Sequence, residues 1–281
     1  MKKNTSQLWD EFWKNTDPIE EDILKLAMEE NSIRWQRIEK IVLKKFGSFE
    51  NLEVIEIGAG SGTNAALMAK RGAQITILDY SEKALVRARE LFERNNLSAE
   101  FIKQNALSLP SDLLNKYDIS MSFGLAEHFR GDERIKINKA HFDILKKGGI
   151  TFISVPNKYN FPYRIFKFIA ECTDRWEVGE EYPYSRKEFR DICKQIGITK
   201  YSFSGDSLFS SFSFIKQIKT ILLNDITRKV LKMVRGGWRV QRYIDRHKSR
   251  FNRNSSIFNK KEKGTFLDQY LSYALVVYGT K

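Results

Sequence analysis

Residues 53–62 read EVIEIGAGSG, a short apolar run that leads into a loop with three glycines. The apolar run predicts a buried strand, and the residues from Ser61 to Lys70 predict a helix directly after the loop. Glycine lets the backbone approach a ligand closely and adopt a positive φ in a tight turn. The pattern alone fits both a ligand-binding turn and a plain strand–helix connection.

The same strand-then-helix pattern continues along the chain. We expect helix over most of 6–46, and Gly47 ends that region. Near-continuous apolar strands that alternate with helices predict an α/β fold with a parallel sheet covered on both faces. The expected strands are 53–57, 74–78, 101–102, 117–122, 150–155, 198–203 and 270–278, and the expected helices after the first glycine loop are 61–70, 81–94, 132–147 and 185–195. The helix 132–147 should end at Gly148-Gly149, and the last strand should lie at the sheet edge or pair with 198–203.

Composition excludes several classes of protein. Of 281 residues, 42% are hydrophobic and 30% charged, which excludes collagen-like and wholly disordered chains. Two cysteines are too few for a disulfide scaffold, and His128, His141 and His247 form no metal-binding pair, so we expect no metal site. The first residues have no apolar signal region, and no apolar run is long enough to span a bilayer. We therefore expect a cytoplasmic protein, with peripheral membrane association left open.

Asp79 strengthens the ligand-binding interpretation of the glycine loop. It closes the second strand, where a carboxylate can accept hydrogen bonds from both ribose hydroxyls of a nucleotide, although it could also cap the helix near Ser81. Dinucleotide loops read G-x-G-x-x-G, whereas here Gly62 comes one residue early and Glu56 precedes the loop. A carboxylate would repel a phosphate but attract the α-ammonium group of S-adenosylmethionine, which has no phosphate. The loop therefore favours S-adenosylmethionine over NAD.

The stretch VIEIGAGSGTNAALMAKRGAQITILDYSEKAL (54–85) resembles the first two motifs of class I S-adenosylmethionine-dependent methyltransferases. More narrowly, the chain resembles the small-molecule type 11/12 group, which includes ubiquinone-biosynthesis-like enzymes, over about 30–205 and the final strand. This resemblance implies a Rossmann-like fold with seven mostly parallel strands and helices on both faces. We expect an N-terminal helical cap (1–46), a cofactor-binding core (47–206), a basic amphipathic insertion (207–264) and a final core strand (265–281).

The resemblance also implies a set of cofactor-binding residues. The glycine loop would cradle the cofactor, Asp79 would bind the ribose and Tyr80 would flank the adenine. Asn105 stands where the family commonly has an acidic residue near the adenine amino group, and YDISMSFGLAEHF (117–129) resembles the fourth-strand motif beside the methionine part. The expected residues are Glu56, Gly58, Ala59, Gly60, Gly62, Asp79, Tyr80, Asn105, Ala106, Ser122, Phe123 and Gly124.

The methyl acceptor is less sharply indicated. The sequence has no motif typical of exocyclic adenine, cytosine-C5, metal-dependent catechol or arginine methylation, which leaves a small or medium-sized organic acceptor. We expect methyl transfer to an O or N atom of a small or lipid-like acceptor, with transfer to carbon as the less favoured alternative. A general base is needed only if the acceptor carries a tightly held proton. His128 is the candidate base, although it could simply order its loop. Trp13, Asn157, Tyr159 and Tyr163 are the candidate substrate-binding residues.

Aromatic residues gather in two stretches that could roof a substrate pocket or form a second small core. They are Trp9, Phe12, Trp13 and Trp35, and then Phe161, Tyr163, Phe166, Phe168, Trp176, Tyr182 and Tyr184.

Most of the net charge of +13 lies in one late segment. Residues 216–263 contain 15 Lys or Arg and 3 Asp or Glu, and the remainder contains 33 basic and 32 acidic residues. Apolar residues recur there at helical spacing: Ile215, Ile218, Leu222, Ile226, Val230 and Met233. Three interpretations remain open: a helical lid on the core, an element that meets an anionic membrane or lipid-like substrate, and an RNA-binding appendage with Trp238, Tyr243 and Phe251. An RNA methyltransferase and a non-catalytic cofactor-binding protein are therefore the alternative functions.

Overall fold

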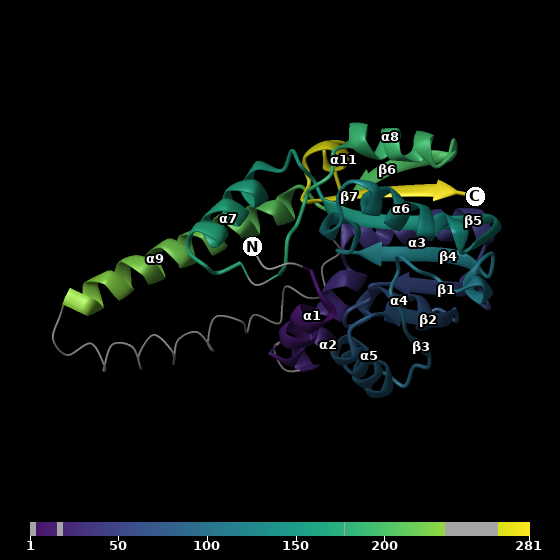
Figure 1. The fold of residues 1–281 in the computed structure, drawn as a ribbon, viewed down its shortest axis with the longest axis horizontal. Coiled ribbons are helices and arrows are strands. Elements are labelled where there is room, and N and C mark those ends of the chain that lie inside the picture. Colours follow the sequence, from purple (N-terminus) through teal and green to yellow (C-terminus); the bar gives the residue numbers. More distant parts are fainter. Residues whose placement is uncertain (1–3, 16–18, 177, 234–263) are drawn as a thin grey trace.

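Seven strands form one sheet in the order β3-β2-β1-β4-β5-β7-β6 (Figure 1). The computed structural model describes residues 4–15, 19–176, 178–233 and 264–281. Strands β1 to β5 are parallel, and β7 runs antiparallel between β5 and β6. The strands are β1 (Glu53–Ile57), β2 (Gln74–Asp79), β3 (Glu100–Lys103), β4 (Tyr117–Phe123), β5 (Leu145–Pro156), β6 (Tyr201–Gly205) and β7 (Ala274–Thr280).

Helices cover both faces of this sheet, as predicted. One apolar core joins the sheet to α2, α3, α4 and α5, and a second joins its other face to α6 and α8. The helices are α1 (Ser6–Lys14), α2 (Ile19–Glu30), α3 (Ile33–Phe46), α4 (Thr63–Ala69), α5 (Glu82–Arg94), α6 (Asp132–Asp143), α7 (Phe161–Cys172), α8 (Arg186–Gln195), α9 (Ser213–Met233) and α11 (Asp268–Leu271). Within the described residues there are also three 3₁₀ turns: η1 (Ser111–Leu113), η2 (Ala126–His128) and η3 (Phe209–Phe212).

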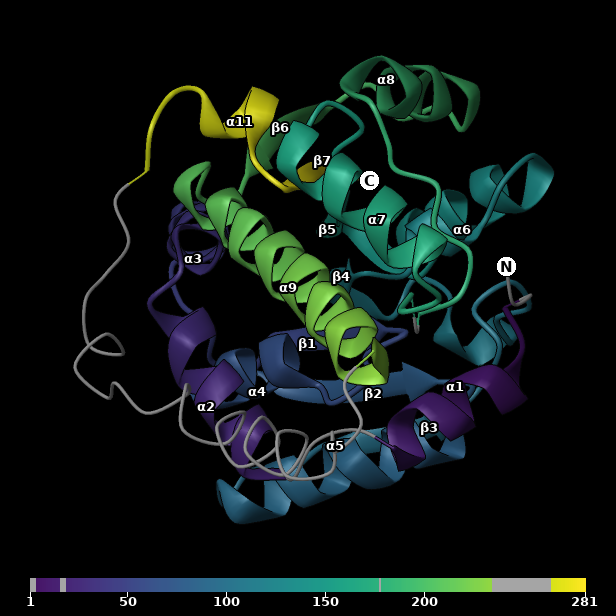
Figure 2. The same ribbon diagram turned by 90° about the vertical axis from the view of Figure 1, so that its left-hand side faces the viewer.

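The strand order predicts where a ligand-binding crevice lies in the sheet. Strand β1 pairs with β2 on one side and β4 on the other, so the winding of the chain reverses between β1 and β4. In such sheets ligands bind outside the carboxyl ends of the strands at that reversal. Helices α1, α2, α7 and α9 lie at this end (left in Figure 1), and Figure 2 shows it face on, with α9 nearest the viewer.

The boundary between α6 and β5 differs from the prediction. The helix ends at Asp143 and β5 begins at Leu145, so Gly148-Gly149 lies inside the strand and does not terminate the helix. Leu145 pairs with Tyr117, and both side chains are fully buried, so the strand places Leu145 in the apolar core. The register between the two strands then shifts before Ile119, and Gly148 takes a φ of +84° there.

The last two strands also begin later than predicted. Tyr270 and Leu271 belong to the short helix α11, and β7 starts at Ala274. Strand β6 starts at Tyr201, because Ile198 packs into the second core ahead of the strand. Strand β7 pairs with β6 as expected but also with β5, so β6 and not β7 lies at the sheet edge.

The insertion before β7 begins with η3 and the long helix α9, which runs beside α7 and projects away from the sheet (Figures 1 and 2). Residues 234–263, with Trp238, Tyr243, His247 and Phe251, lie outside the described residues. Over the part of the chain that the structure describes, no helix has both the length and the apolar character needed to cross a membrane.

Candidate functional site

The glycine loop turns sharply at the carboxyl end of β1. Gly58 N donates to the Leu78 carbonyl at 2.7 Å, and Gly60 N donates to Asp79 Oδ2 at 3.0 Å. Gly60 has a φ of +55°, and a methyl group added there would lie only 2.5 Å from Trp13 Cζ2. The loop backbone therefore lies directly beneath the Trp13 ring of α1.

Asp79 lies at the end of β2 and is almost fully buried. Its Oδ1 accepts a hydrogen bond from Ser81 N at 2.9 Å, so its two oxygens join the glycine loop to the start of α5. Burial raises the pKa of Asp79, and the bonds from backbone N–H groups oppose that rise. Asp79 thus holds the turn before α5, whose N-cap is Ser81, and its role as a ribose-binding residue stays a prediction.

A cavity of about 530 Å³ opens beside the loop. It extends from the loop and the ends of β1, β4 and β5 to α2, α3 and the segments that flank β6 and β7. Its lining residues are Trp13, Lys25, Met28, Glu29, Ser32, Arg34, Glu56, Ala59, Gly60, Ser61, Thr63, Asn64, Phe123, Gly124, Glu127, Ser154, Val155, Pro156, Asp206, Ser210, Tyr273 and Ala274. A cavity of this size at the carboxyl ends of the strands can hold a small organic ligand.

Glu56 contributes a carboxyl group to the cavity floor. It is 2% exposed, and its Oε2 accepts a hydrogen bond from Ala65 N at 2.8 Å. Burial raises the pKa of Glu56 to about 8, although the Ala65 N–H and Arg34 both favour the ionised form. A cationic ligand group beside Glu56 would stabilise the carboxylate and lower that pKa.

Arg34 contributes a positively charged side chain to the cavity wall, where it is paired with Glu29. Arg34 Nε and Nη2 donate to the two carboxylate oxygens of Glu29 at 2.8 and 2.7 Å. The guanidinium also lies over the Phe123 ring, 5.1 Å from its centroid. Burial by itself would lower the pKa of Arg34, but Glu29 raises it, so Arg34 keeps its charge. The pair gives the cavity both a positive and a negative group at fixed positions.

Glu127 lines the cavity, whereas the neighbouring His128 is not among its lining residues. His128 Nδ1 lies 2.8 Å from the Glu180 carbonyl oxygen, and its ring contacts Trp9 edge to face at 4.9 Å between centroids. Burial lowers the pKa of His128 to about 4. Glu127 is 2% exposed, and its Oε2 has no hydrogen-bond partner among the described residues. Burial, reinforced by Glu181, raises the pKa of Glu127 well above its ordinary value.

Glu127, His128 and Glu181 also bring possible metal-ligating atoms within 4.8 Å of one another. Two of these side chains already bond inside the protein, because Tyr163 Oη donates to Glu181 Oε2 at 2.6 Å and His128 meets the Glu180 carbonyl. Acidic groups of this kind are common without a metal, and we assign none here.

The other predicted cofactor-binding residues lie around the same end of the sheet but outside the cavity lining. Tyr80 follows β2, and Asn105 follows β3, where its Oδ1 accepts from Leu107 N at 2.9 Å. Ala106 is buried in the second core. Ser122 is buried with no partner for its Oγ among the described residues. Gly58, Gly62 and Asp79 support the loop that carries Ala59 and Gly60 to the cavity.

The predicted substrate-binding residues do not gather in one place. Trp13 lines the cavity, but Tyr159 is 53% exposed and Tyr163 is buried against Glu181. Asn157 is buried, and its Nδ2 donates to the carbonyls of Tyr270 and Ser272 at 2.8 and 3.1 Å. Its Oδ1 accepts from Tyr159 N at 3.0 Å, so the whole side chain is used to fix loops.

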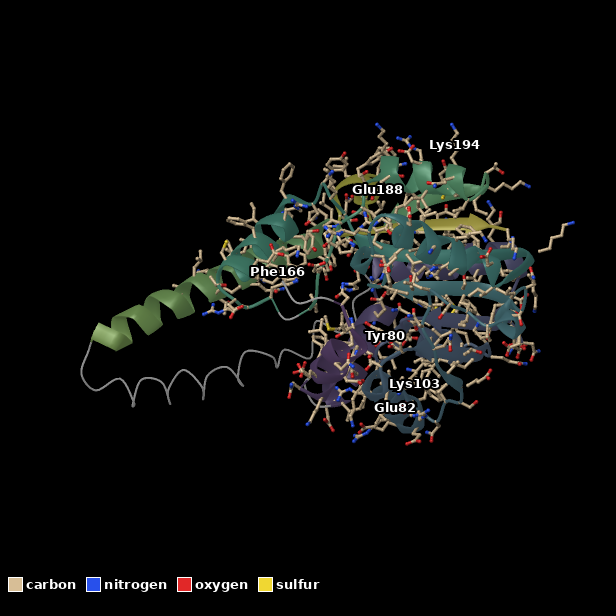
Figure 3. All side chains as sticks on the ribbon, in the orientation of Figure 1. Tyr80, Glu82, Lys103, Phe166, Glu188 and Lys194 are labelled. Atoms are coloured by element: carbon tan, nitrogen blue, oxygen red, sulfur yellow. The ribbon has the colours of Figure 1, made fainter. Side chains whose placement is uncertain are left out.

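The aromatic residues that the sequence offered as a cover for the substrate pocket also lie in different parts of the structure. Trp35 is fully buried and stacks on Phe49 in the first core, so it is a packing residue. Phe166 lies between α7 and α9, 5.3 Å from the Phe214 ring (Figure 3). Phe161 and Phe168 are exposed. Only Trp13 of the predicted aromatic residues lines the cavity.

Sequence reasoning missed several residues that line the cavity. Arg34 and Glu29 lie in an ordinary-looking amphipathic region, and nothing in their spacing marks them. Tyr273 and Asp206 come from the flanks of β7 and β6, far apart in sequence from the glycine loop. Glu127 did carry a signal, because it stands beside His128 in the quoted fourth-strand motif.

Known proteins share this domain. A family model described as "Methyltransferase domain" matches residues 54–149. A ubiquinone biosynthesis O-methyltransferase of Rickettsia felis is 23% identical over 156 residues, and one of Ruegeria pomeroyi is 26% identical over 154 residues. These matches cover 56% and 53% of this chain, and 62% and 61% of the relatives, so the chain spans less than two thirds of their length.

A solved structure shows the same fold. It is a putative sarcosine dimethylglycine methyltransferase from Galdieria sulphuraria, with a TM-score of 0.53 and 16% identity. The alignment covers 88% of this chain and 84% of that one.

Proposed function

We propose that this chain, which matches a methyltransferase domain over 54–149, is a class I S-adenosylmethionine-dependent methyltransferase that methylates an O or N atom of a small or lipid-like organic acceptor. The observation that carries the proposal is the continuous cavity that joins the glycine loop at Gly60 to Glu127 and Tyr273. The two relatives described above are O-methyltransferases, which supports an oxygen acceptor over nitrogen.

The residues of the cavity fit S-adenosylmethionine. Glu56 offers a carboxyl group to the α-ammonium, and Arg34 offers a permanent cation to the α-carboxylate. Asn64 lines the same cavity, and its buried Oδ1 has no hydrogen-bond partner among the described residues. When bound, this cofactor supplies a methyl group on a positively charged sulfur, which is already a reactive electrophile.

The cofactor's adenosine end would lie at Asp79, beneath α1. Asp79 accepts from the backbone N–H groups of Gly60, Tyr80 and Ser81, and its two carboxylate oxygens have lone pairs left for ribose hydroxyls. Trp13 and Asp10 of α1 cover this half of the site. We therefore expect α1 to shift when the cofactor enters.

For an acceptor hydroxyl we propose Glu127 as the group that takes its proton. Glu127 lines the cavity, and its buried Oε2 has no partner among the described residues. The raised pKa of Glu127 makes its carboxylate a stronger base than an ordinary one. His128, the base that the sequence suggested, stays an alternative. Its bond to the Glu180 carbonyl and its pKa of about 4 favour a role in fixing the turn that carries Glu127.

Calorimetry with S-adenosylhomocysteine tests the cofactor assignment. The wild-type protein should bind it, and Asp79→Ala should weaken binding by about 1.5–3 kcal/mol for each charge-assisted bond lost. Asp112→Ala, at the distant turn η1, is a matched control that should bind normally. Equal affinity of Asp79→Ala and wild type, with an intact fold, would contradict the assignment.

A further inference from the structure

An exposed apolar surface projects from the end of the molecule that carries the cavity. It consists of Phe161, Ile165 and Phe168 on α7, and of Phe209, Phe212 and Ile215 at η3 and the start of α9. We call these six residues the apolar platform. Each is more than half exposed, and Phe161, Phe168 and Phe209 reach 72%, 66% and 63%. Contiguous apolar surfaces of this kind on soluble domains mark interaction sites.

A buried side chain joins the two segments that carry the platform. Asn160 caps α7 by accepting from Tyr163 N at 2.9 Å. Its Nδ2 donates to Ser211 Oγ in η3 and to the Leu271 carbonyl in α11, both at 2.8 Å. The Phe166 and Phe214 rings then pack between α7 and α9. The exposed rings are thus held on a fixed base.

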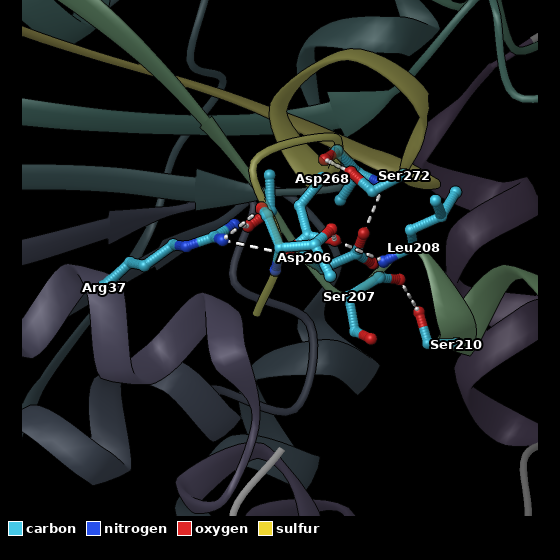
Figure 4. A network of polar contacts seen from close by, with 10 residues as sticks. Arg37, Asp206, Ser207, Leu208, Ser210, Asp268 and Ser272 are labelled. Atoms are coloured by element: carbon cyan, nitrogen blue, oxygen red, sulfur yellow. Dashed lines mark hydrogen bonds and ion pairs between the residues drawn. The ribbon is translucent and has the colours of Figure 1, made fainter. Parts of the chain in front are cut away.

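A second polar network fixes the segment that leads into the platform (Figure 4). Asp268 Oδ1 accepts from Leu208 N at 2.9 Å, and Asp268 Oδ2 accepts from Arg37 Nη2 at 2.8 Å. Arg37 Nη1 also donates to the Gly205 carbonyl at 2.8 Å. The ion pair between Arg37 of α3 and Asp268 restricts the motion of the connection between β6 and η3. The platform is therefore held in a fixed position relative to the core.

The platform borders the cavity. Ser210 lies between Phe209 and Phe212 in η3, and it lines the cavity together with Asp206 and Tyr273. An apolar molecule that met the platform would therefore stand beside the cavity wall.

Cations predominate among the exposed charges around the platform. Within 158–172 and 207–223, the exposed charged side chains are Lys158, Arg164, Lys216 and Lys219, whereas Glu171 is half-buried and paired with Lys167, and the exposed Asp174 follows the end of α7. Apolar side chains among cations match a bilayer surface with anionic headgroups, where rings enter the acyl boundary and the cations stay at the phosphates. A symmetric dimer through this face would instead bring like charges together. A nucleic-acid backbone would leave the six apolar side chains without a partner.

We propose that the apolar platform docks this protein on an anionic lipid bilayer, so that a bilayer-dissolved acceptor reaches the cavity past Ser210. The second part rests on the proposed methyl transfer, and the docking itself does not.

Vesicle co-sedimentation of the full chain tests the docking. Vesicles of phosphatidylcholine with phosphatidylglycerol should retain the protein in a salt-sensitive way, and pure phosphatidylcholine should retain less. Phe161→Ser combined with Phe168→Ser should lower the partition coefficient about tenfold or more, because two exposed rings no longer enter the membrane. Lys216→Glu with Lys219→Glu should lower binding to the anionic vesicles roughly fivefold or more. Val86→Ser on α5, which is 50% exposed, and Lys187→Glu on α8 are the matched controls and should bind as wild type.

The outcomes separate the two proposals. Equal binding by the platform variants and the controls would overturn the docking, and so would salt-resistant retention on RNA or a dimer in ultracentrifugation that the Phe variants dissolve. S-adenosylhomocysteine affinity, measured on the same variants, should stay unchanged. Loss of cofactor binding in the wild type would defeat the methyltransferase proposal and leave the vesicle result standing.

Discussion

The Ser81 hydroxyl donates a hydrogen bond to Asp10 Oδ1 across 2.6 Å, which ties α1 to the turn just after Asp79. Asp10 Oδ1 also accepts from Lys83 N at 3.2 Å. Three residues later on the same helix, Trp13 packs against Gly60. The first helix therefore spans the two backbone segments that would bind the adenosine part of the cofactor.

Removing this tie should speed cofactor entry. Asp10→Ala deletes both bonds, each of which contributes about 1 kcal/mol, so we expect S-adenosylhomocysteine to associate roughly fivefold faster or more. Stopped-flow tryptophan fluorescence can follow the change at Trp13. Glu11→Ala, an exposed carboxylate on the same helix, is the control and should leave the rate unchanged. Identical rates for Asp10→Ala and wild type would show that α1 does not limit entry.

Cofactor binding should release a proton from Glu56. The pKa of Glu56 is raised to about 8 in the free protein, so the group is mostly neutral at pH 7. A nearby ligand cation favours the carboxylate and lowers that pKa, so binding expels the proton and affinity falls as the pH drops below about 8. Calorimetry in buffers of different ionisation enthalpy measures the released proton.

The matched variant for this prediction is Glu56→Gln, which keeps the shape of the side chain and cannot titrate. It should bind S-adenosylhomocysteine with less dependence on pH and without that proton release. If the wild type and Glu56→Gln release the same number of protons, another group is responsible.

Glu127 and His128 can be separated by their pH profiles once an acceptor is known. Glu127→Gln should lower kcat by about 10²–10⁴ and leave S-adenosylhomocysteine affinity unchanged, because a general base acts on the chemical step. In the wild type, kcat should rise with pH through the raised pKa of Glu127, and that rise should vanish in Glu127→Gln. His128→Asn should keep the wild-type shape of the profile. The reverse pattern would make His128 the base, as the sequence predicted.

Asn157 should matter for stability and not for ligand binding. Asn157→Ala removes three hydrogen bonds and leaves the carbonyls of Tyr270 and Ser272 with fewer donors, so we expect the free energy of unfolding to fall by about 2–4 kcal/mol. Asn95→Ala, which loses one bond to the Leu91 carbonyl, should cost only about 1 kcal/mol. Urea denaturation measures both. A stable Asn157→Ala protein with a raised KM for the acceptor would restore its predicted substrate role.

The parts of the site that depend on local backbone were predictable from the sequence. A strand that ends in three glycines, and a second strand that ends in Asp79, fix the loop because neighbouring parallel strands finish at the same edge. The core strands were also predictable, because a short run of apolar residues between turn signals is typical of a strand buried in a parallel sheet. The α6–β5 boundary was not, because the pairing of Leu145 with Tyr117 depends on a distant strand.

The far wall of the cavity could not be predicted. Arg34, Glu29 and Tyr273 reach it only because α2, α3 and the start of β7 pack at the carboxyl end of the sheet. The choice between Glu127 and His128 depends on the 3₁₀ turn η2, which directs the first toward the cavity and the second toward Glu180. The amino-acid sequence of the motif alone does not show which of the two side chains faces the cavity.

The position of β7 between β5 and β6 has a consequence for how the chain folds during synthesis. Strand β6 is made before β7, yet it joins the sheet only through β7. Until 274–280 leave the ribosome, β5 presents an open edge of unpaired backbone groups, and β6 has no neighbour to pair with. Open edges of this kind invite pairing with other chains. The growing polypeptide is therefore most exposed to aggregation while 206–273 are being translated, and a chaperone that covers the β5 edge would protect it then.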